Sequence, residues 1–264
     1  DEKEVYASLV ADMRLLGERT GQMHQALAGA PQDLPGFAPE PVTSEDIQSW
    51  KEDIHAQIND TAAVVQNDKH WPDKLKISGE QFIRNIPIMH DRIDALLASG
   101  APGWLKTRVH GDYHLGQVLI AHDDFYVVDF EGEPASSMQK RRQKHIPLKD
   151  VAGMLRSFDY AGATVLHQLR EQISGSEETL ASRIRHWGML ASSAFISGYQ
   201  SAAGFRLDAE QIAVFNNLLS AFLLEKALYE VRYEAANRPD WLFLPLEGLR
   251  RLLSEGTSYD LHAM

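Results

Sequence analysis

Apolar residues recur every three or four positions through most of the chain, which is the spacing of one face of an α-helix. The first run predicts an amphipathic helix that ends near Gly29, with an apolar face formed by Val5, Leu9, Met13 and Leu16. The same spacing predicts six further helices, over residues 43–65, 79–99, 148–172, 177–203, 208–237 and 246–255. A mostly helical body is therefore expected.

Proline and capping residues mark where the early helices begin and bend. The proline-rich segment APQDLPGFAPEPV, residues 30–42, predicts a loop or tether, because proline lacks an amide donor and restricts the residue before it. Thr43 followed by Asp46 resembles a capping pattern and predicts the start of the next helix. Pro87 predicts a bend in the helix over residues 79–99, because it removes one backbone hydrogen bond.

The strongest strand pattern lies near the middle of the chain. Residues 117–120 and 125–130 are β-branched and aromatic runs joined by AHDD, which is typical of a short β-hairpin. This hairpin lies within RVHGDYHLGQVLIAHDDFYVVDFEGEP, residues 108–134, where charged side chains cluster. The expected fold class is α+β, mostly α, with a small hairpin at the functional site.

Composition excludes several classes of function. The 264 residues are 44% apolar and 24% charged, which fits a globular protein. The chain has no cysteine, so a disulfide framework and a thiolate nucleophile are both excluded. A formal charge of −11 argues against general attraction to nucleic acid or to anionic lipid. We expect a cytoplasmic protein without nucleic-acid or membrane partners. Because the chain begins with Asp1 rather than methionine, it is expected to be a piece of a longer protein.

The hairpin would bring its two ends together and so place Asp112 and Asp129 at one site. Phosphoryl transfer needs two such carboxylates, one to orient the attacking hydroxyl and one to hold Mg²⁺ against the phosphate oxygens. Gln117 lies five residues after Asp112, where protein kinases have an amide that also binds metal. Gly111 suits a tight turn, and His110 would orient the loop through its ring. The pattern predicts a kinase-like site.

Two other interpretations of this segment remain open. A hairpin with acidic ends can be an ordinary solvated surface element. A metal hydrolase could instead use His110, His114 and His122 with the aspartates, since imidazole and carboxylate groups suit zinc or manganese. His110 and His114 would share a face only on a helix, whereas Gly111 and the following strand favour an extended loop.

Several segments together resemble one family. HGDYHLGQVL and VVDFEGEP resemble the maltokinase family, a branch of the aminoglycoside phosphotransferase-like kinases. The resemblance continues in LGERTGQMHQALA near the start, in KDVAGMLRSFDYA after the hairpin and in LLEKALYEVRYEAANRPDWLFLPLEGL near the end, so it spans nearly the whole chain. It implies the helical C-terminal lobe of a protein-kinase-like fold.

The resemblance also implies an activity and its partners. Such a kinase transfers the γ-phosphate of ATP to the anomeric hydroxyl of maltose and yields maltose 1-phosphate for α-glucan synthesis, and it is fused to or paired with trehalose synthase in many bacteria. By position, Asp112 resembles the catalytic base, and Gln117 and Asp129 resemble the ligands of Mg²⁺ that bind the nucleotide.

Sugar binding is expected on a late helix. In such kinases the helical lobe holds the sugar, and the matching residues here are Lys226, Tyr229, Glu230 and Tyr233, on one helical face. Tyrosine rings can stack on a pyranose while charged groups bond its hydroxyls. His110 is a further candidate substrate-binding residue. An equally open interpretation is that Lys226 and Glu230 form an ordinary ion pair and that the tyrosines pack in a core.

The first part of the chain lacks a pattern that a complete kinase needs. Residues 1–105 show helices and a proline tether, with no glycine-rich strand, loop and strand to cover the phosphates. We therefore expect leading helices over 1–105, the catalytic segment over 106–134, a sugar-binding bundle over 146–256, and little phosphate transfer by this chain alone. A noncatalytic kinase-like module that binds α-glucan or trehalose synthase, and a kinase for an aminoglycoside, choline or another small alcohol, are the alternatives.

Overall fold

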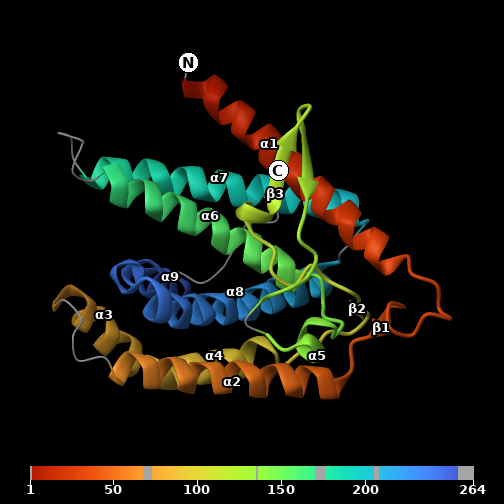
Figure 1. The fold of residues 1–264 in the computed structure, drawn as a ribbon, viewed down its shortest axis with the longest axis horizontal. Coiled ribbons are helices and arrows are strands. Elements are labelled where there is room, and N and C mark those ends of the chain that lie inside the picture. The colour runs from red at the N-terminus through yellow and green to blue at the C-terminus, as the bar shows by residue number, and fades with distance from the viewer. Residues whose placement is uncertain (1, 68–72, 135, 170–176, 205–207, 255–264) are drawn as a thin grey trace. The chain divides into compact units, whose positions relative to one another are not determined.

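The computed structural model describes the chain except for residues 1, 68–72, 135, 170–176, 205–207 and 255–264 (Figure 1). The chain divides into two compact units. The first consists chiefly of Asp1–Pro41 and Leu105–Asp208, and the second of Val42–Trp104 and Ala209–Ser258. Each unit is described on its own below.

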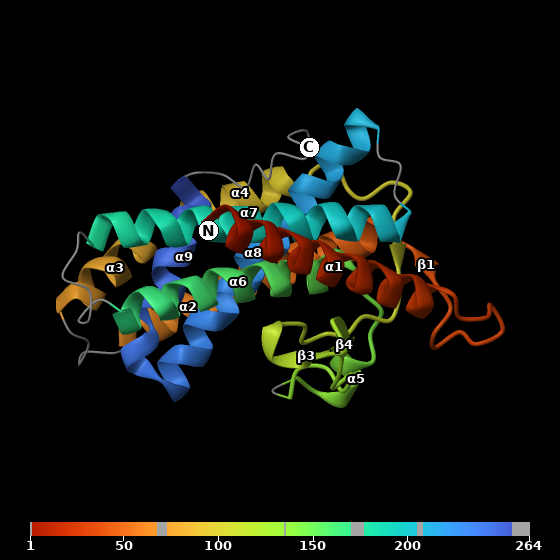
Figure 2. The same ribbon diagram turned by 90° about the horizontal axis from the view of Figure 1, so that it is seen from above.

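The first unit is built on three long helices, α1 (Glu2–Ala28), α6 (Leu148–Leu169) and α7 (Glu177–Ala203). Helix α1 lies along α7, and α7 lies beside α6 (Figures 1 and 2). Two short antiparallel strands, β1 (Glu40–Pro41) and β2 (Leu105–Lys106), and the short helix α5 (Met138–Arg141) also belong to this unit.

Glycines let α1 and α7 approach until their backbones touch. A Cβ on Gly17 would lie 2.0 Å from the carbonyl oxygen of Phe195, and a Cβ on Gly198 would lie 2.0 Å from that of Arg14. One turn after Gly17, a Cβ on Gly21 would lie 2.8 Å from the Cβ of Ala202. Larger residues at these positions would force the helices apart, so the glycines set how α1 is placed against α7.

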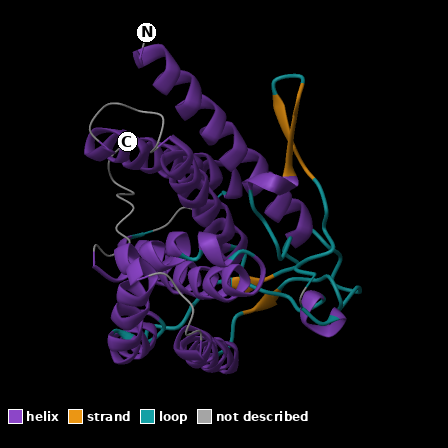
Figure 3. Ribbon diagram, turned by 60° about the vertical axis from the view of Figure 1, so that its left-hand side comes forward, coloured by secondary structure: helices purple, strands orange, loops and turns teal. Residues whose placement is uncertain are grey.

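The hairpin consists of β3 (Val118–Ala121) and β4 (Asp124–Val127), and a 3-10 turn, η1 (Leu115–Gln117), precedes it. It stands as a separate two-stranded ribbon among helices and loops (Figure 3). Ala121 pairs with Asp124, so the loop has two residues, His122 and Asp123, with φ of 53° and 58°. These positive angles define the tight hairpin turn whose twist matches that of the strands. The predicted hairpin is confirmed, although β4 ends before Val128.

The second unit is a helical bundle of α2 (Ser44–Asn67), α3 (Asp73–Arg84), α4 (Ile86–Leu96), α8 (Ala209–Asn237) and α9 (Phe243–Ser254), with a 3-10 turn, η2 (Pro239–Trp241), between the last two. Helix α8 lies at its centre and packs against α2, α4 and α9. Among the described helices, α8 is long and apolar enough to cross a membrane, but 61% of its apolar window is buried, as in the core helix of a globular protein.

Most predicted helices are confirmed to within a few residues, and the fold is mostly helical with small sheets. The capping pattern at α2 is confirmed, because the Thr43 amide donates to Asp46 Oδ2 (2.8 Å) and the Asp46 amide to Thr43 Oγ1 (3.2 Å). The prediction of one bent helix over 79–99 is wrong. The chain breaks at Asn85, and Pro87 lies in the first turn of α4, where its missing amide costs no hydrogen bond. Residues 170–172 and 255–256 of the predicted segments lie outside the described residues.

Candidate active site

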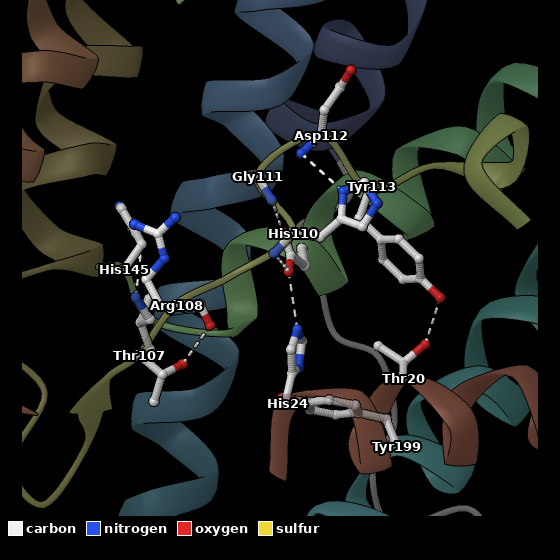
Figure 4. Close-up of polar contacts among 12 residues, drawn as sticks. Thr20, His24, Thr107, Arg108, His110, Gly111, Asp112, Tyr113, His145 and Tyr199 are labelled. Atoms are coloured by element: carbon white, nitrogen blue, oxygen red, sulfur yellow. Dashed lines mark hydrogen bonds and ion pairs between the residues drawn. The ribbon is translucent and has the colours of Figure 1, made fainter. Parts of the chain in front are cut away.

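The turn at His110–Asp112, called here the catalytic turn because it bears the predicted catalytic residue Asp112, joins β2 to the hairpin. Gly111 has φ of 84°, which an L-residue adopts only at a cost, so glycine is required there. A Cβ at this position would also lie 3.4 Å from the Cα of Gly132, on the far side of the hairpin. The side chains of Asp112 and Tyr113 point in opposite directions, with Tyr113 directed into the fold toward α1 (Figure 4). The turn therefore presents Asp112 while it anchors the next residue.

The ring of His110 connects the two ends of the hairpin. It is fully buried, and its Nε2 donates to the carbonyl oxygen of Val128 (2.8 Å). Its Nδ1 accepts from the amide of Asp112 (3.3 Å), so the tautomer with hydrogen on Nε2 satisfies both contacts. The ring also packs beside Phe130 at 5.0 Å between centroids. This arrangement matches the predicted orienting role of His110, and the burial of the ring leaves no face for a substrate in this conformation.

Asp129 follows directly on the carbonyl that His110 binds. Its φ of 64° is unusual for a residue other than glycine, and such backbone strain concentrates at functional sites. The Nε2 of Gln117 donates to Asp129 Oδ2 (3.1 Å) from the start of the hairpin, so the two predicted metal ligands lie side by side. A carboxylate and an amide oxygen suit Mg²⁺, which commonly takes one or two protein ligands and completes its shell with water and phosphate. The residues present fit the expected ion.

The structure does not favour the metal hydrolase interpretation. Both ring nitrogens of His110 already have hydrogen-bond partners, and His122 lies in the hairpin turn. His114 is near the site, with its Nε2 3.9 Å from Asp112 Oδ2 and its Nδ1 accepting from the Gly116 amide (3.0 Å). Within the described parts of the chain, no three His, Cys, Asp or Glu side chains are grouped to hold a metal ion.

A buried carboxylate that was not predicted lies beneath the catalytic turn. Asp150, in the first turn of α6, is 2% exposed. It accepts from the amide of His110 (2.7 Å, Oδ2), from the amide of Gly111 (2.9 Å, Oδ1) and from His24 Nε2 (3.0 Å, Oδ2). Burial alone would raise the pKa of Asp150, but the hydrogen bonds from His24 and the two amides outweigh it and lower the pKa. Asp150 is therefore an anion that holds the turn.

Helix α1 supplies further partners in this network. The ring of His24 is 4% exposed, and its Nδ1 lies 3.1 Å from the hydroxyl of Tyr199 on α7. One turn earlier, Thr20 Oγ1 donates to the carbonyl oxygen of Leu16 (2.8 Å), so the Tyr113 hydroxyl donates to Thr20 Oγ1 (2.8 Å; Figure 4). Burial raises the pKa of both tyrosines far above its ordinary value, so both hydroxyls stay protonated.

Sequence reasoning missed Asp150 and His24. They lie 38 residues after Asp112 and 88 residues before it, so no local spacing connects them to the catalytic turn. The available clue was an aspartate within the apolar run of KDVAGML: an acidic residue on the buried side of a helix requires a partner.

The predicted sugar-binding residues lie on α8, in the second unit. The ammonium of Lys226 lies 4.6 Å from the ring centroid of Tyr229, and the rings of Tyr229 and Tyr233 are 6.0 Å apart. Tyr233 is 44% exposed and Glu230 is half-buried, so these residues are not packed wholly inside a core. The aromatic pair and the cation therefore form a continuous partly exposed face, as a sugar site requires. Their role stays a prediction.

Comparison with known proteins finds similarity to glucosamine kinases. It is 28% identical to glucosamine kinase from Streptacidiphilus jiangxiensis over 240 residues, which cover 91% of this chain and 49% of that protein. It is 27% identical to glucosamine kinase from Mycolicibacterium smegmatis over 220 residues, which cover 83% of this chain and 49% of that protein. No protein-family model matches the chain.

Solved structures agree with these sequence matches. A structure of glucosamine kinase in complex with glucosamine, ADP and inorganic phosphate has a TM-score of 0.74 and 25% identity, and the match covers 94% of this chain and 53% of that one. A second crystal structure of glucosamine kinase, in crystal form A, also has a TM-score of 0.74, with 95% and 52% covered. The chain is homologous to glucosamine kinase. It has the fold of the C-terminal portion and spans about half the length of these relatives. The narrower resemblance to maltokinases is not supported by these matches.

Proposed function

We propose that the complete protein transfers the γ-phosphate of ATP to a hydroxyl of a small sugar, and that this chain supplies the C-terminal lobe with the catalytic carboxylates. The observation that carries the proposal is the bond from His110 Nε2 to the Val128 carbonyl (2.8 Å), which ties the turn bearing Asp112 to the segment bearing Asp129. Phosphoryl transfer depends on positioning and electrostatics, so a rigid link between two such carboxylates is what the reaction needs. A reaction that consumes ATP suits the cytoplasm.

In this proposal the aspartates have different tasks. Asp112 orients the sugar hydroxyl and accepts its proton late in the transfer. Asp129 and Gln117 would hold Mg²⁺, whose positive charge would neutralise the phosphate oxygens. His110 carries no proton in the reaction, because both of its ring nitrogens are engaged in holding the turn. The strained backbone at Asp129 sets the direction of its carboxylate.

The acceptor we propose first is glucosamine or a closely similar amino sugar, because the homologous proteins are glucosamine kinases and one of their structures holds glucosamine. Maltose, and with it a pairing with trehalose synthase, is the alternative suggested by the segments that resemble maltokinases. The partly exposed face of α8 bearing Lys226, Tyr229, Glu230 and Tyr233 would contribute to the sugar site, with the rings as an apolar wall and the charged groups as hydrogen-bond partners.

The test is phosphate transfer by the complete protein with MgATP, with glucosamine and maltose measured side by side. Asp112→Asn should lower kcat by about 10²- to 10⁴-fold and leave binding of both substrates nearly unchanged, since it removes the proton acceptor alone. Asp129→Ala should abolish Mg²⁺-dependent nucleotide binding. Asp123→Asn is the matched control, because Asp123 lies in the turn of the same hairpin and asparagine tolerates its φ of 58°.

Two results would contradict the proposal. One is an Asp112→Asn protein that keeps full kcat, and the other is wild-type protein that phosphorylates no sugar. Calorimetric titration of the 264-residue chain with glucosamine, with maltose and with MgATP helps to distinguish a kinase lobe from a noncatalytic binding module. Sugar binding together with unimpaired activity of Asp112→Asn and Asp129→Ala in the complete protein would assign this lobe to binding alone.

A further inference from the structure

We propose that His24, on α1, is a positioning residue for Asp112, and that it acts through the buried carboxylate of Asp150. The inference deepens the phosphotransferase proposal and rests on it for its kinetic consequences. It also gives α1 a task, since the sequence pattern predicted only an amphipathic helix there. His24 touches neither phosphate nor sugar in this assignment. It acts on the backbone that presents the catalytic carboxylate.

The chain of contacts is short and continuous. His24 Nε2 donates to Asp150 Oδ2 (3.0 Å), and Asp150 accepts from the amides of His110 (2.7 Å) and Gly111 (2.9 Å). These are the two amides immediately before Asp112. A carboxylate that holds both fixes two successive peptide planes, and so fixes the direction in which the next residue leaves the turn. Any rotation of the Asp150 carboxylate would be transmitted to Asp112.

His24 determines how the Asp150 carboxylate is oriented. Because an ionised carboxylate only accepts hydrogen bonds, the His24 Nε2 must carry the hydrogen, and in the neutral ring Nδ1 accepts from the Tyr199 hydroxyl (3.1 Å). The rings of His24 and Tyr199 also meet edge to face, with centroids 5.5 Å apart. The imidazole is thus held at both nitrogens and by an edge-to-face contact with the Tyr199 ring. Such partners fix the tautomer and direction of a histidine.

The same helix also holds the residue that follows Asp112. Thr20, one turn before His24, accepts from the Tyr113 hydroxyl (2.8 Å), so α1 holds Tyr113 directly and holds the amides of His110 and Gly111 through Asp150. Gly17 and Gly21 place α1 in backbone contact with α7, which prevents α1 from sliding without a clash. Two contacts from one immobile helix define the position of the residue between them.

A purely structural role for His24 would lower stability and leave the rate of folded protein unchanged. A positioning role predicts a loss in kcat, because a displacement of about 1 Å in a catalytic group can cost about 10²-fold in rate. The two substitutions that separate these roles are His24→Leu, which removes the donor, and His24→Gln, whose amide can donate to Asp150 in place of Nε2. Phe195→Leu on α7 is the stability control, because Phe195 is buried and packs on Phe158 (5.6 Å between centroids).

In the complete protein, we expect His24→Leu to lower kcat about 10- to 100-fold with the KM for sugar and for MgATP within about twofold of wild type. His24→Gln should recover most of this loss. Phe195→Leu, at an equal or greater loss of unfolding stability, should keep kcat within about twofold. The inference is overturned if His24→Leu keeps the wild-type kcat, or if Phe195→Leu loses as much kcat at the same stability.

A second measurement does not depend on activity. Amide hydrogen exchange of the 264-residue chain reports directly on the His110 and Gly111 amides that Asp150 holds. We expect exchange at these two amides to accelerate about tenfold more in His24→Leu than in Phe195→Leu, whose lower global stability affects all protected amides alike. Unchanged exchange in His24→Leu would refute the positioning role even in an active kinase. If the wild-type protein transfers no phosphate, the proposed function fails while this measurement still decides the contact.

Tyr199→Phe keeps the inference testable if His24→Leu does not fold. The phenyl ring retains the packing of Tyr199 against His24 but removes the hydroxyl that partners Nδ1. We expect a smaller loss in kcat, about two- to fivefold, with unchanged KM values. A kcat equal to wild type in Tyr199→Phe, with unchanged exchange at His110 and Gly111, would show that the orientation of His24 does not matter.

Discussion

Helix α1 contacts two aspartates of the catalytic region, and their surroundings differ. Asp150, beneath the catalytic turn, is almost wholly buried and accepts from His24 and from two backbone amides. Asp124, where β4 begins, accepts from Arg19 Nε (2.7 Å) and from its terminal nitrogen (3.0 Å). Arg19 and Asp124 are each about one third exposed. Both contacts have good hydrogen-bond geometry, but they should contribute very differently to the free energy of unfolding.

The two contacts differ because water can replace the partners of Asp124 but cannot reach the partners of Asp150. For Asp124, the hydrogen bond from Arg19 lowers the pKa of the carboxyl, but solvent reaches both partners and screens the pair. For Asp150 no solvent is within reach, so removal of the carboxylate leaves amides and an imidazole with nothing to bind. We therefore expect the buried contact, rather than the exposed one, to determine the position of Asp112. The exposed contact between Arg19 and Asp124 should hold the hairpin only locally against α1.

The largest expected effect follows from removing the buried carboxylate. Asp150→Ala should lower the free energy of unfolding by about 3–5 kcal/mol, because three buried donors lose their acceptor. Urea unfolding of the 264-residue chain, followed by circular dichroism, measures this. Asp150→Asn keeps one acceptor oxygen and should cost less. A loss below about 1 kcal/mol in the alanine variant would show that the two aspartates are equivalent after all.

The next effect concerns the glycine contacts that place α1. Gly17→Ala should cost about 1–3 kcal/mol through overpacking, although alanine is the better helix former by up to about 1 kcal/mol. Gly188→Ala on α7 is the matched control, since a Cβ there meets no atom within 4 Å. Thermal unfolding should show a lower Tm for the first and an equal or higher Tm for the second. An equal rise in Tm in Gly17→Ala and Gly188→Ala would mean that α1 can move away from α7 without cost.

Loss of the Tyr113 hydroxyl should have an intermediate effect. Tyr113→Phe should cost about 1 kcal/mol at neutral pH, the usual net value of one buried hydrogen bond. The pKa of Tyr113 is raised in the fold, so its stabilising effect is complete below the ordinary tyrosine pKa of about 10 and is lost as pH rises toward the folded value. Between about pH 7 and 11, the free energy of unfolding should therefore decrease with pH more steeply for wild type than for the phenylalanine variant.

Acid should weaken the buried contact over a narrow range. Because the pKa of Asp150 is lowered in the fold, its contribution is complete above the ordinary aspartate pKa of about 3.9 and is lost as pH falls through the folded value. The stability difference between wild type and Asp150→Asn should accordingly shrink below about pH 4. A difference that persists unchanged to about pH 2 would mean that charge is not what holds the turn.

The smallest effect is expected at the exposed aspartate. Asp124→Ala should leave global unfolding unchanged within error, because the Arg19 pair is screened by solvent. Hydrogen exchange in the hairpin should nevertheless increase locally, and the increase should resemble that of wild type in about 1 M salt, where the pair is screened further. A global loss as large as that of Asp150→Ala would remove the distinction between the two aspartates.

Helices and the hairpin were predictable because their patterns are local. Apolar spacing predicted α7 over 177–203 as observed, and AHDD predicted the hairpin turn. The pairing of Gln117 with Asp129 followed from the hairpin, since a two-residue turn brings its ends together. The break at Asn85 was missed because a proline eight residues after the expected helix start at Gly79 fits either a bend in one helix or the first turn of a new helix.

By itself, the sequence determined that the fold is mostly helical, where the hairpin lies, and that Asp112, Gln117 and Asp129 lie near its ends. These features depend on residues that are close together in the chain. Tertiary structure alone decided that Asp150 and His24 meet beneath the catalytic turn and that Thr20 on α1 meets Tyr113. Those contacts join positions up to 126 residues apart. Burial then decides their strength, because a carboxylate shielded from water must be satisfied by the protein, whereas one at the surface can be satisfied by solvent.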